Sequence, residues 1–292
     1  MKINMTLKYQ QTKNYHRIIV SFIFFALYPT FCFSQNLYDR EHSQKYALYL
    51  YSSQQYVLAA EEYERLVYFD KSDVGFKYNL IKSYRLSGEL KTGISRIYSF
   101  YGKSLDTIPH LLATEYIKLQ LLTDSLSVAE KFLKQNRNLF PEDKLVYQSC
   151  NLLLSGEYTE ASLLAKESKA TNPAFPSGIL NLTEKASEIK FKSPYIAGGF
   201  SAVIPGTGKF YTKNWVDGFF SMLFVAGNTW QSYRGFKEHG IKSGYGWVFA
   251  SLSASFYIGN IFGAVKAAKR YNKIKTNEID NQVFEFVRTD SF

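Results

Sequence analysis

The residues best placed to do chemistry lie at Gly206-Thr207-Gly208-Lys209, which contains the glycines and the lysine of a phosphate-binding loop. Such a loop also needs a glycine where this chain has Val203. The residue after the lysine must be Ser or Thr to hold magnesium, and here it is Phe210. The sequence therefore excludes this kind of nucleotide site.

The remaining candidates for chemistry are histidines and paired carboxylates. His42 and His110 lie far apart and have no partner at the spacing of metal ligands. Glu142 and Asp143 follow Pro141, so we interpret them as first-turn residues that favour the helix dipole. The motifs of zinc proteases, serine hydrolases and dinucleotide enzymes are absent from the sequence. We expect no catalytic, metal or cofactor residue, and a protein that is not an enzyme.

The charge pattern indicates what kind of elements the chain contains. Its 292 residues are 46% hydrophobic and 21% charged, which excludes a disordered chain, and the net charge is +10. Residues 1–34 contribute +4, residues 35–190 are balanced, and residues 191–292 contribute +6. Positive charge beside apolar segments is typical of membrane proteins. No nucleic-acid-binding motif accompanies it, so we expect no nucleic-acid partner.

The N-terminus has the three-part anatomy of a secretory signal. Arg17 precedes an uncharged stretch over residues 18–28, and Cys32 and Ser34 occupy the small-residue positions before Gln35. We therefore predict a signal peptide over residues 1–34. An uncleaved anchor and a lipoprotein acylated at Cys32 remain as alternatives. The signal-peptide and anchor interpretations both place the following residues outside the cytoplasm.

Residues 35–175 contain four copies of one pattern. After a turn, an aromatic residue or Leu is followed three positions later by a small residue and four positions after that by a large apolar residue. The copies are Tyr56, Ala59 and Tyr63; Leu90, Gly93 and Ile97; Leu126, Ala129 and Leu133; and Tyr158, Ala161 and Ala165. Their starts are 34, 36 and 32 residues apart. The third copy departs at its last position, three residues after Leu133, where Asn136 takes the place of an expected apolar residue.

This pattern resembles the tetratricopeptide repeat, whose period is about 34 residues. A small residue lets two helices approach closely where they cross. The resemblance implies an all-α fold, in which about four αα-hairpins form a short superhelical stack with a groove for a protein or peptide. Residues 176–192 are expected to form a closing or linker helix.

Residues 193–275 are predicted to form a membrane module. Charge-free runs cover residues 193–208, 218–233 and 243–265. The third run is long enough to span a bilayer, and the second spans only with its flanking residues. The first is interrupted by Pro205-Gly206 and is better interpreted as an interfacial or re-entrant helix. We therefore expect a C-terminal transmembrane helical hairpin and a separate tail over residues 276–292.

The third run carries small residues at every fourth position. This row predicts a smooth ridge on which another helix packs, with the helix over residues 216–233 as the expected partner and a homodimer as the alternative. The ridge consists of Ser251, Ser255, Gly259, Gly263 and Ala267. Asn228 and Asn260 are polar within apolar runs, so each needs a partner. We expect them to bond to each other, with a substrate site as the alternative.

The turn between the first two runs is distinctive. It contains Pro205, Gly206, Gly208, Phe210 and Tyr211, and resembles the P-G-x-G-x-F/Y-Y turn of small bacterial two-span membrane modules that often follow helical repeats. The resemblance implies a membrane location and supplies no mechanism. The glycines would allow a tight turn, with the two aromatic residues as interfacial anchors.

The sequence leaves the number of membrane crossings open. Five basic residues at positions 266, 269, 270, 273 and 275 follow the last run and predict a cytoplasmic tail. Exported repeats would then require an odd number of crossings, whereas two spans give an even number. Either residues 193–208 also cross, or the basic tail faces lipid headgroups on the far side.

These expectations favour a non-enzymatic, membrane-anchored adaptor of the bacterial cell envelope. Its exported repeats would bind a protein or peptide partner, its hairpin would contact membrane lipid, and its last transmembrane helix could form a homo-oligomer. The alternative is a membrane module that oligomerises or handles a lipid or small solute, regulated by the repeats.

Overall fold

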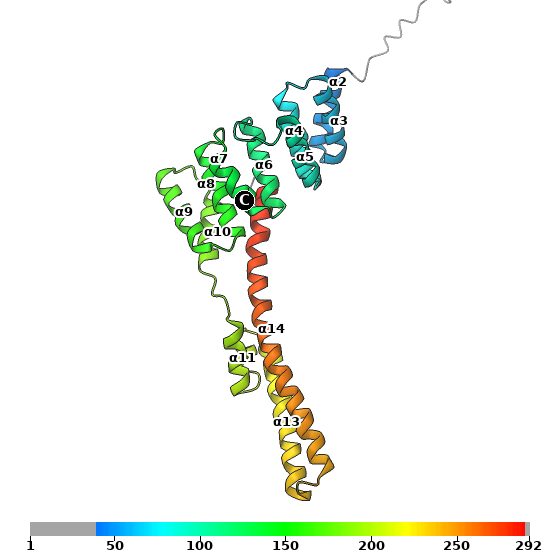
Figure 1. Cartoon of the computed structure of the whole chain (residues 1–292), viewed down its shortest axis with the longest axis vertical. Coiled ribbons are helices and arrows are strands. Elements are labelled where there is room, and N and C mark those ends of the chain that lie inside the picture. The colour runs from blue at the N-terminus through cyan, green and yellow to red at the C-terminus, as the bar shows by residue number, and fades with distance from the viewer. Residues whose placement is uncertain (1–38, 290–292) are drawn as a thin grey trace, which may run out of the picture.

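The computed structural model describes residues 39–289, and every regular element in this range is an α-helix (Figure 1). The expected signal peptide, residues 1–34, lies outside the described residues. The helices form a stack at one end of the molecule and a long hairpin at the other. The all-α fold class is therefore confirmed.

Consecutive helices pack in pairs through the stack. The pairs are α2 (Arg40–Ser52) with α3 (Tyr56–Phe69), α4 (Val74–Ser87) with α5 (Leu90–Tyr101), α6 (His110–Leu122) with α7 (Leu126–Gln135), and α8 (Pro141–Leu154) with α9 (Tyr158–Thr171). Helix α10 (Ser177–Ser187) packs on α8 and α9 and ends the stack. The predicted repeat-like arrangement of αα-hairpins is confirmed.

Local sequence explains why the helices begin and end at these positions. Asp39 and Asp73 accept hydrogen bonds from backbone N–H groups in the first turns of α2 and α4, as N-cap residues do. Gly88 ends α4 with φ of 86°, a left-handed conformation that glycine adopts without steric cost. The short turns that result hold the two helices of each pair side by side.

Asn136 explains why the third copy of the pattern departs from the others. Helix α7 ends one residue earlier, and Asn136 is buried at its C-cap. Its Nδ2 donates to the backbone carbonyl of Leu105 at 2.8 Å. Its Oδ1 accepts from the backbone N–H groups of Asn138 and Leu139. The amide therefore satisfies buried backbone groups of two loops, which an apolar side chain could not do.

The hydrophobic core of the stack includes the end of the last helix. Leu112, Ile117 and Leu153 are fully buried, and Ile279 and Val283 of α14 (Gly244–Thr289) belong to the same core cluster. Residues 276–289 are thus the continuation of one long helix. Residues 276–289 therefore do not form the separate tail expected over residues 276–292. They continue the helix because apolar side chains at every fourth residue bury one of its faces in the stack.

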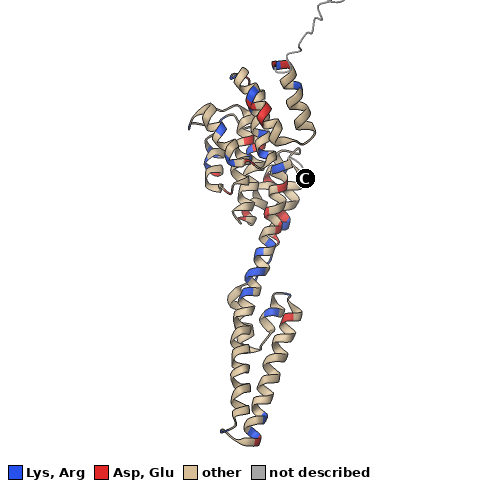
Figure 2. Ribbon diagram, turned by 90° about the vertical axis from the view of Figure 1, so that its right-hand side faces the viewer, with Lys and Arg blue, Asp and Glu red and all other residues tan. Residues whose placement is uncertain are grey.

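The hairpin is built from α13 (Trp215–His239) and the first part of α14, with α11 (Pro194–Val203) and α12 (Thr207–Tyr211) packed beside them. Helix α14 has 46 residues, a length of about 69 Å at 1.5 Å per residue. It runs from the tip of the hairpin into the repeat stack (Figures 1 and 2). Among the described helices, α14 alone is long and apolar enough to cross a membrane.

The two helices of the hairpin approach closely near its tip. A Cβ atom added to Gly235 of α13 would lie 2.7 Å from the Cα of Gly246 on α14. Ser232 Oγ donates to the backbone carbonyl of Gly246 at 3.0 Å. Figure 2 shows charged residues at the tip and a basic stretch of α14 between the hairpin and the stack. That stretch contains the five basic residues noted in the sequence.

Candidate functional site

The repeat-pattern residues all lie on the second helices of the pairs. Tyr56, Leu90, Leu126 and Tyr158 are the first residues of α3, α5, α7 and α9. The small residues Ala59, Gly93, Ala129 and Ala161 are buried, as is Tyr63. A Cβ atom on Gly93 would lie 3.3 Å from Tyr84 Cβ on α4 and 3.2 Å from Leu119 on α6. These residues therefore pack the stack together and do not line its surface.

The glycines of the α11–α12 turn lie where backbones approach each other. Gly206 has φ of 93°, and a Cβ atom there would lie 2.2 Å from the backbone carbonyl oxygen of Gly218 on α13. A Cβ atom on Gly208 would lie 1.8 Å from the carbonyl oxygen of Ala197 on α11. Pro205 precedes this contact, so the turn holds α11, α12 and α13 together.

The two aromatic residues of the turn pack within the module. Phe210 stacks on Trp215 with ring centroids 5.2 Å apart, and its ring covers Gly218. Tyr211 packs edge-on against Phe200 at 5.7 Å, and its hydroxyl accepts a hydrogen bond from the backbone N–H of Ser193. Both rings therefore fasten α12 to its neighbours.

The small-residue ridge of α14 does not pack on α13 as expected. Ser251, Ser255 and Gly259 are exposed, and a Cβ atom on Gly259 would meet nothing within 4 Å. Ser253 and Phe256 face α13 instead, through hydrogen bonds of Ser253 Oγ and a ring stack between Phe256 and Phe224. Every face of this helix is apolar or small, so the four-residue spacing does not identify the face that meets α13. Gly263 and Ala267, the other ridge members, are half-buried.

The two asparagines of the apolar runs, Asn228 and Asn260, do not bond to each other. Asn228 Nδ2 donates to the carbonyl of Phe224 on its own helix at 2.7 Å, which satisfies it locally. Asn260 is 4% exposed, and neither its Nδ2 nor its Oδ1 has a hydrogen-bond partner. The expected bond is therefore wrong, and a buried amide without a partner needs another explanation.

Lys209 contacts α14 within one turn of this asparagine. Its Nζ donates to Ser221 Oγ at 2.7 Å, and its side chain passes against Gly263 on α14. Gly263 is three residues from Asn260, so the Lys209 contact and the asparagine lie within one turn of α14. Within residues 39–289 no carboxylate forms an ion pair with Lys209.

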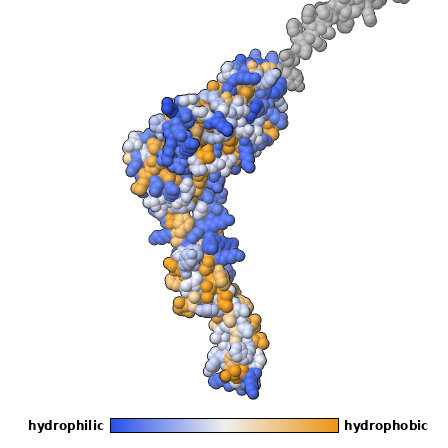
Figure 3. Space-filling model, in the orientation of Figure 1, coloured by the Kyte–Doolittle hydropathy of each residue, from blue (hydrophilic) through white to orange (hydrophobic). Residues whose placement is uncertain are grey.

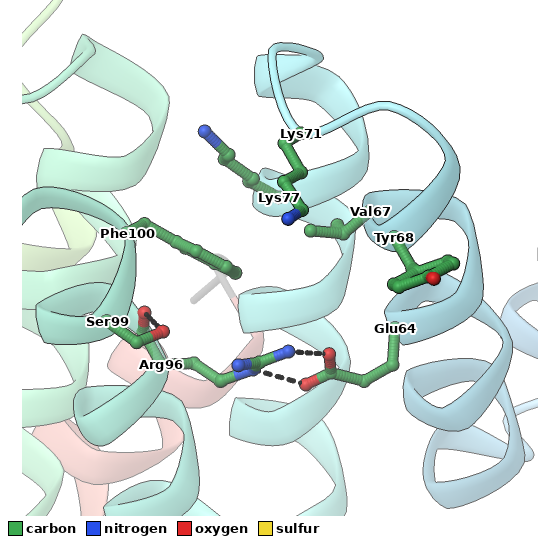
Figure 4. A pocket seen from close by; sticks show the side chains of 8 residues that line it. All are labelled: Glu64, Val67, Tyr68, Lys71, Lys77, Arg96, Ser99 and Phe100. Atoms are coloured by element: carbon green, nitrogen blue, oxygen red, sulfur yellow. Dashed lines mark hydrogen bonds and ion pairs between the residues drawn. The ribbon is translucent and has the colours of Figure 1, made fainter.

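The repeat stack contains a surface groove between α3, α4 and α5. Its volume is about 340 Å³, and Figure 4 shows eight side chains that line it. They are Glu64, Val67, Tyr68, Lys71, Lys77, Arg96, Ser99 and Phe100. The floor is apolar, and the side chain of Tyr68 at the rim belongs to a residue that is 77% exposed.

The one acid of the groove is neutralised by its neighbours. Arg96 Nε donates to Glu64 Oε1 at 2.6 Å, and Arg96 Nη2 bonds to Glu64 Oε2 (Figure 4). This bidentate bond to Glu64 raises the pKa of Arg96. Burial, and after it the hydrogen bond that Tyr84 donates to Glu64, raises the pKa of Tyr84. The Glu64 carboxylate is therefore fully engaged and not available to a ligand.

The two lysines of the groove have no acid partner among the described residues. Lys71 is exposed, and Lys77 is half-buried with its Nζ 5.3 Å from the ring centroid of Phe100 and 5.1 Å from that of Tyr101. Two ammonium groups beside an apolar floor favour a ligand that carries carboxylates. The groove could not be located from the sequence pattern, although Glu64 and Arg96 are opposite charges 32 residues apart, close to one repeat period.

A buried ion cluster connects the stack to α14. Arg85 on α4 and Glu115 on α6 are almost completely buried, and Arg85 Nε donates to Glu115 Oε2 at 2.6 Å. Lys118 Nζ donates to Glu115 Oε1 at 3.2 Å. Arg85 Nη1 also donates to the carbonyls of Val287 and Arg288 at the end of α14. The last helix is therefore held inside the stack by hydrogen bonds as well as by packing.

The described part of the chain contains no group of three His, Cys, Asp or Glu residues that could hold a metal ion. The fold and its surfaces define the class of protein, in which a helical repeat-like stack is joined through one long helix to an apolar helical hairpin. Comparison with protein-family models, with curated proteins and with solved structures finds no match.

Proposed function

We propose that this chain is a non-enzymatic, membrane-anchored adaptor of the bacterial cell envelope, which binds a protein or peptide partner through its helical repeats. The observation that carries the proposal is the continuity of α14. One helix begins in the apolar hairpin and ends inside the core of the repeat stack. A partner held on the repeats is thereby fixed at a short distance from the bilayer.

The surface of the hairpin supports the membrane anchor. Phe219, Phe220, Leu223, Leu252 and Phe262 are exposed on α13 and α14, although large apolar patches are rare on water-soluble proteins. Figure 3 shows hydrophobic residues along the hairpin and hydrophilic residues at its tip. Helix α13 has 25 residues, about 37 Å, which exceeds the roughly 30 Å of a hydrocarbon core. It is not apolar enough to cross alone, so we propose that it crosses packed against α14.

The path of the chain favours two crossings. Helix α11 has ten residues, about 15 Å, which is half of what a span requires. Because α14 returns to the stack, its basic stretch and the repeats lie at the same end of the hairpin. We therefore propose two crossings, by α13 and α14, with the basic stretch at the lipid headgroups on the same side of the membrane as the repeats. With the expected export signal, that side is outside the cytoplasm.

The four helix pairs are proposed to be tetratricopeptide-like repeats. Support comes from the period of 32 to 36 residues and from the buried small residue at the same place in each second helix. Proteins built from such pairs offer extended grooves to peptides.

The partner is proposed to be an acidic protein segment that binds in the groove between α3, α4 and α5. Lys71 and Lys77 supply positive charge, because Arg96 already neutralises Glu64. Val67 and Phe100 supply an apolar floor for a side chain of the partner. The ligand class is thus a peptide with carboxylates flanking an apolar or aromatic residue.

Crosslinking in intact cells tests this function. A photoreactive amino acid in place of Tyr68 would capture the partner at the rim of the groove, and mass spectrometry would identify it. We expect Lys71→Glu with Lys77→Glu to abolish the capture, while Lys91→Glu, an exposed lysine outside the groove, leaves it intact. Replacing the hairpin by an unrelated membrane anchor should be tolerated. Loss of capture with a foreign anchor would refute the adaptor function.

Topology reporters test the membrane anchor separately. A reporter fused after residue 292 and one inserted in the loop between α13 and α14, residues 240–243, should report opposite sides of the membrane. Reporters on the same side would refute two crossings.

A further inference from the structure

The junction of α11, α12, α13 and α14 contains unsatisfied polar groups. Lys209 Nζ has Ser221 Oγ as its protein partner, although an ammonium group has three donors. Asn260 is almost fully buried, and both polar atoms of its amide lack a partner. Lys209 on α12 and Asn260 on α14 thus supply a cation and an unpartnered amide beside the same turn of α14, which favours a polar ligand group at the junction.

An apolar groove begins beside this junction. It runs along α13 under the α11–α12 turn, has a volume of about 510 Å³, and is lined by Pro205, Met222, Val225, Trp230 and Tyr233 among others. Lys209 itself does not line the groove, but its partner Ser221 directly precedes Met222, so the ammonium group lies near the end of the groove that is closer to the repeats.

The length of the groove matches one leaflet. From Met222 to Tyr233 the helix rises about 16 Å, close to half of the roughly 30 Å hydrocarbon core. Asn260 lies about 4.5 Å along α14 from Gly263 toward the tip, since it is three residues earlier. A polar group at that depth is level with the ester groups of a lipid whose phosphate lies at Lys209.

We propose that Lys209 and the groove under Pro205 bind one anionic glycerophospholipid from the leaflet on the repeat side. The phosphate pairs with the Lys209 ammonium group, and one acyl chain lies along α13. The basic stretch of α14 begins at Lys266, three residues nearer the stack than Gly263, and raises the local concentration of anionic lipid. The lipid site rests on the membrane anchor proposed above and is independent of the partner on the repeats.

The test uses the full-length protein, reconstituted in vesicles of phosphatidylcholine with a minority of phosphatidylglycerol. After re-extraction in mild detergent, mass spectrometry counts the phosphatidylglycerol that remains with the protein. We expect specific retention by the natural chain. Lys209→Gln should lower it about fivefold, the effect of one basic residue at an anionic surface. Ala226→Trp, a groove residue exposed in the structure, should lower it by filling the groove.

The matched control is Lys242→Gln, which removes the same charge at the hairpin tip and should leave retention unchanged. Excess inorganic phosphate should not displace the lipid, because phosphate alone cannot fill the groove. Displacement by phosphate, or full retention in either Lys209→Gln or Ala226→Trp, would overturn the proposal. Flotation with pure phosphatidylcholine vesicles distinguishes failure of the membrane-anchor proposal from failure of the lipid-site proposal. A protein that does not float refutes the membrane anchor. A protein that floats but retains no phosphatidylglycerol in the extraction experiment refutes the lipid site alone.

Discussion

Arg85 Nη1 on α4 donates a hydrogen bond to the backbone carbonyl of Val287 at 3.1 Å, which joins residues 202 positions apart in the chain. The last carbonyls of a helix have no partner within the helix and carry its negative dipole end. A buried guanidinium group satisfies them here, and Glu115 holds that group in place through Arg85 Nε and Nη2. The end of α14 is thus an integral part of the repeat stack.

The first prediction concerns this contact. Arg85→Leu should destabilise the repeat stack by about 3–5 kcal/mol, because it leaves Glu115 buried without its main partner and the end of α14 without a donor. Far-UV circular dichroism in urea, on the full chain in mild detergent, would show an earlier transition of the stack.

Tryptophan fluorescence supplies a readout that separates the two parts of the molecule. The three tryptophans, Trp215, Trp230 and Trp247, all lie in the hairpin, so their emission should report its unfolding and change little in Arg85→Leu. Lys134→Ala removes an exposed ion pair with Glu130 and should cost no more than about 0.5 kcal/mol. A stability loss of the same size in both variants would contradict the role of Arg85.

The second prediction concerns the turn between α11 and α12. Gly208→Ala should lower the stability of the hairpin module by about 1–3 kcal/mol, because the new methyl group overlaps the carbonyl of Ala197. Thermal unfolding followed by tryptophan fluorescence measures this. Gly199→Ala on α11 is the matched control, since a Cβ atom there meets nothing within 4 Å. It should be neutral or stabilising through helix propensity. Equal losses in both variants would refute the close approach at Gly208.

The third prediction is a pH dependence at Asp280, on the part of α14 inside the stack. Burial, and to a smaller extent the charge of Asp124, raises the pKa of Asp280 in the folded chain. Its Oδ1 is buried without a hydrogen-bond partner. The folded state therefore favours the protonated acid, and stability falls as the pH rises through the folded pKa.

Asp280→Asn should accordingly stabilise the chain at neutral pH. The gain should disappear below the ordinary carboxyl value of 3.8, where Asp280 is protonated in both the folded and the unfolded state. Urea unfolding at several pH values measures it, with the exposed Asp106→Asn as control. A gain that is the same at all pH values would show that burial of the charge is not the cause.

The parts of the fold that follow from local pattern could be predicted from the sequence. The αα-hairpins could be predicted because a small residue recurs wherever two helices must approach closely, at Ala59, Gly93, Ala129 and Ala161. The return of α14 into the stack was missed, although Ile279, Val283 and Val287 show the four-residue period of a buried helical face.

Other features could not be derived from the sequence at all. The contact between Arg85 and Val287 depends on a tertiary arrangement that local pattern does not contain. The face of α14 that meets α13 was assigned to the small-residue ridge, whereas the close approach occurs between Gly235 and Gly246. In an apolar helix small residues occur on more than one face, so spacing alone does not select the one that packs within the chain.

The fourth prediction follows from that difference. Ser251, Ser255 and Gly259 form an exposed face of α14, and small residues at this spacing allow close approach of a second helix in a bilayer. If the ridge joins two copies of the chain, Gly259→Ile should lower the dimer fraction, measured by energy transfer between labelled chains in vesicles. The hairpin fold should be unchanged, because nothing in the chain lies within 4 Å of the added Cβ.

Gly227→Ile makes the comparison specific. Gly227 also has open space around it, but it lies on α13, away from the ridge. The isoleucine there adds the same bulk and the same β-branched side chain to a helix of the same hairpin, so it should leave the dimer fraction unchanged. Loss of energy transfer in Gly259→Ile alone would assign the dimer contact to the ridge. Unchanged transfer in Gly259→Ile would mean that this face of α14 contacts lipid.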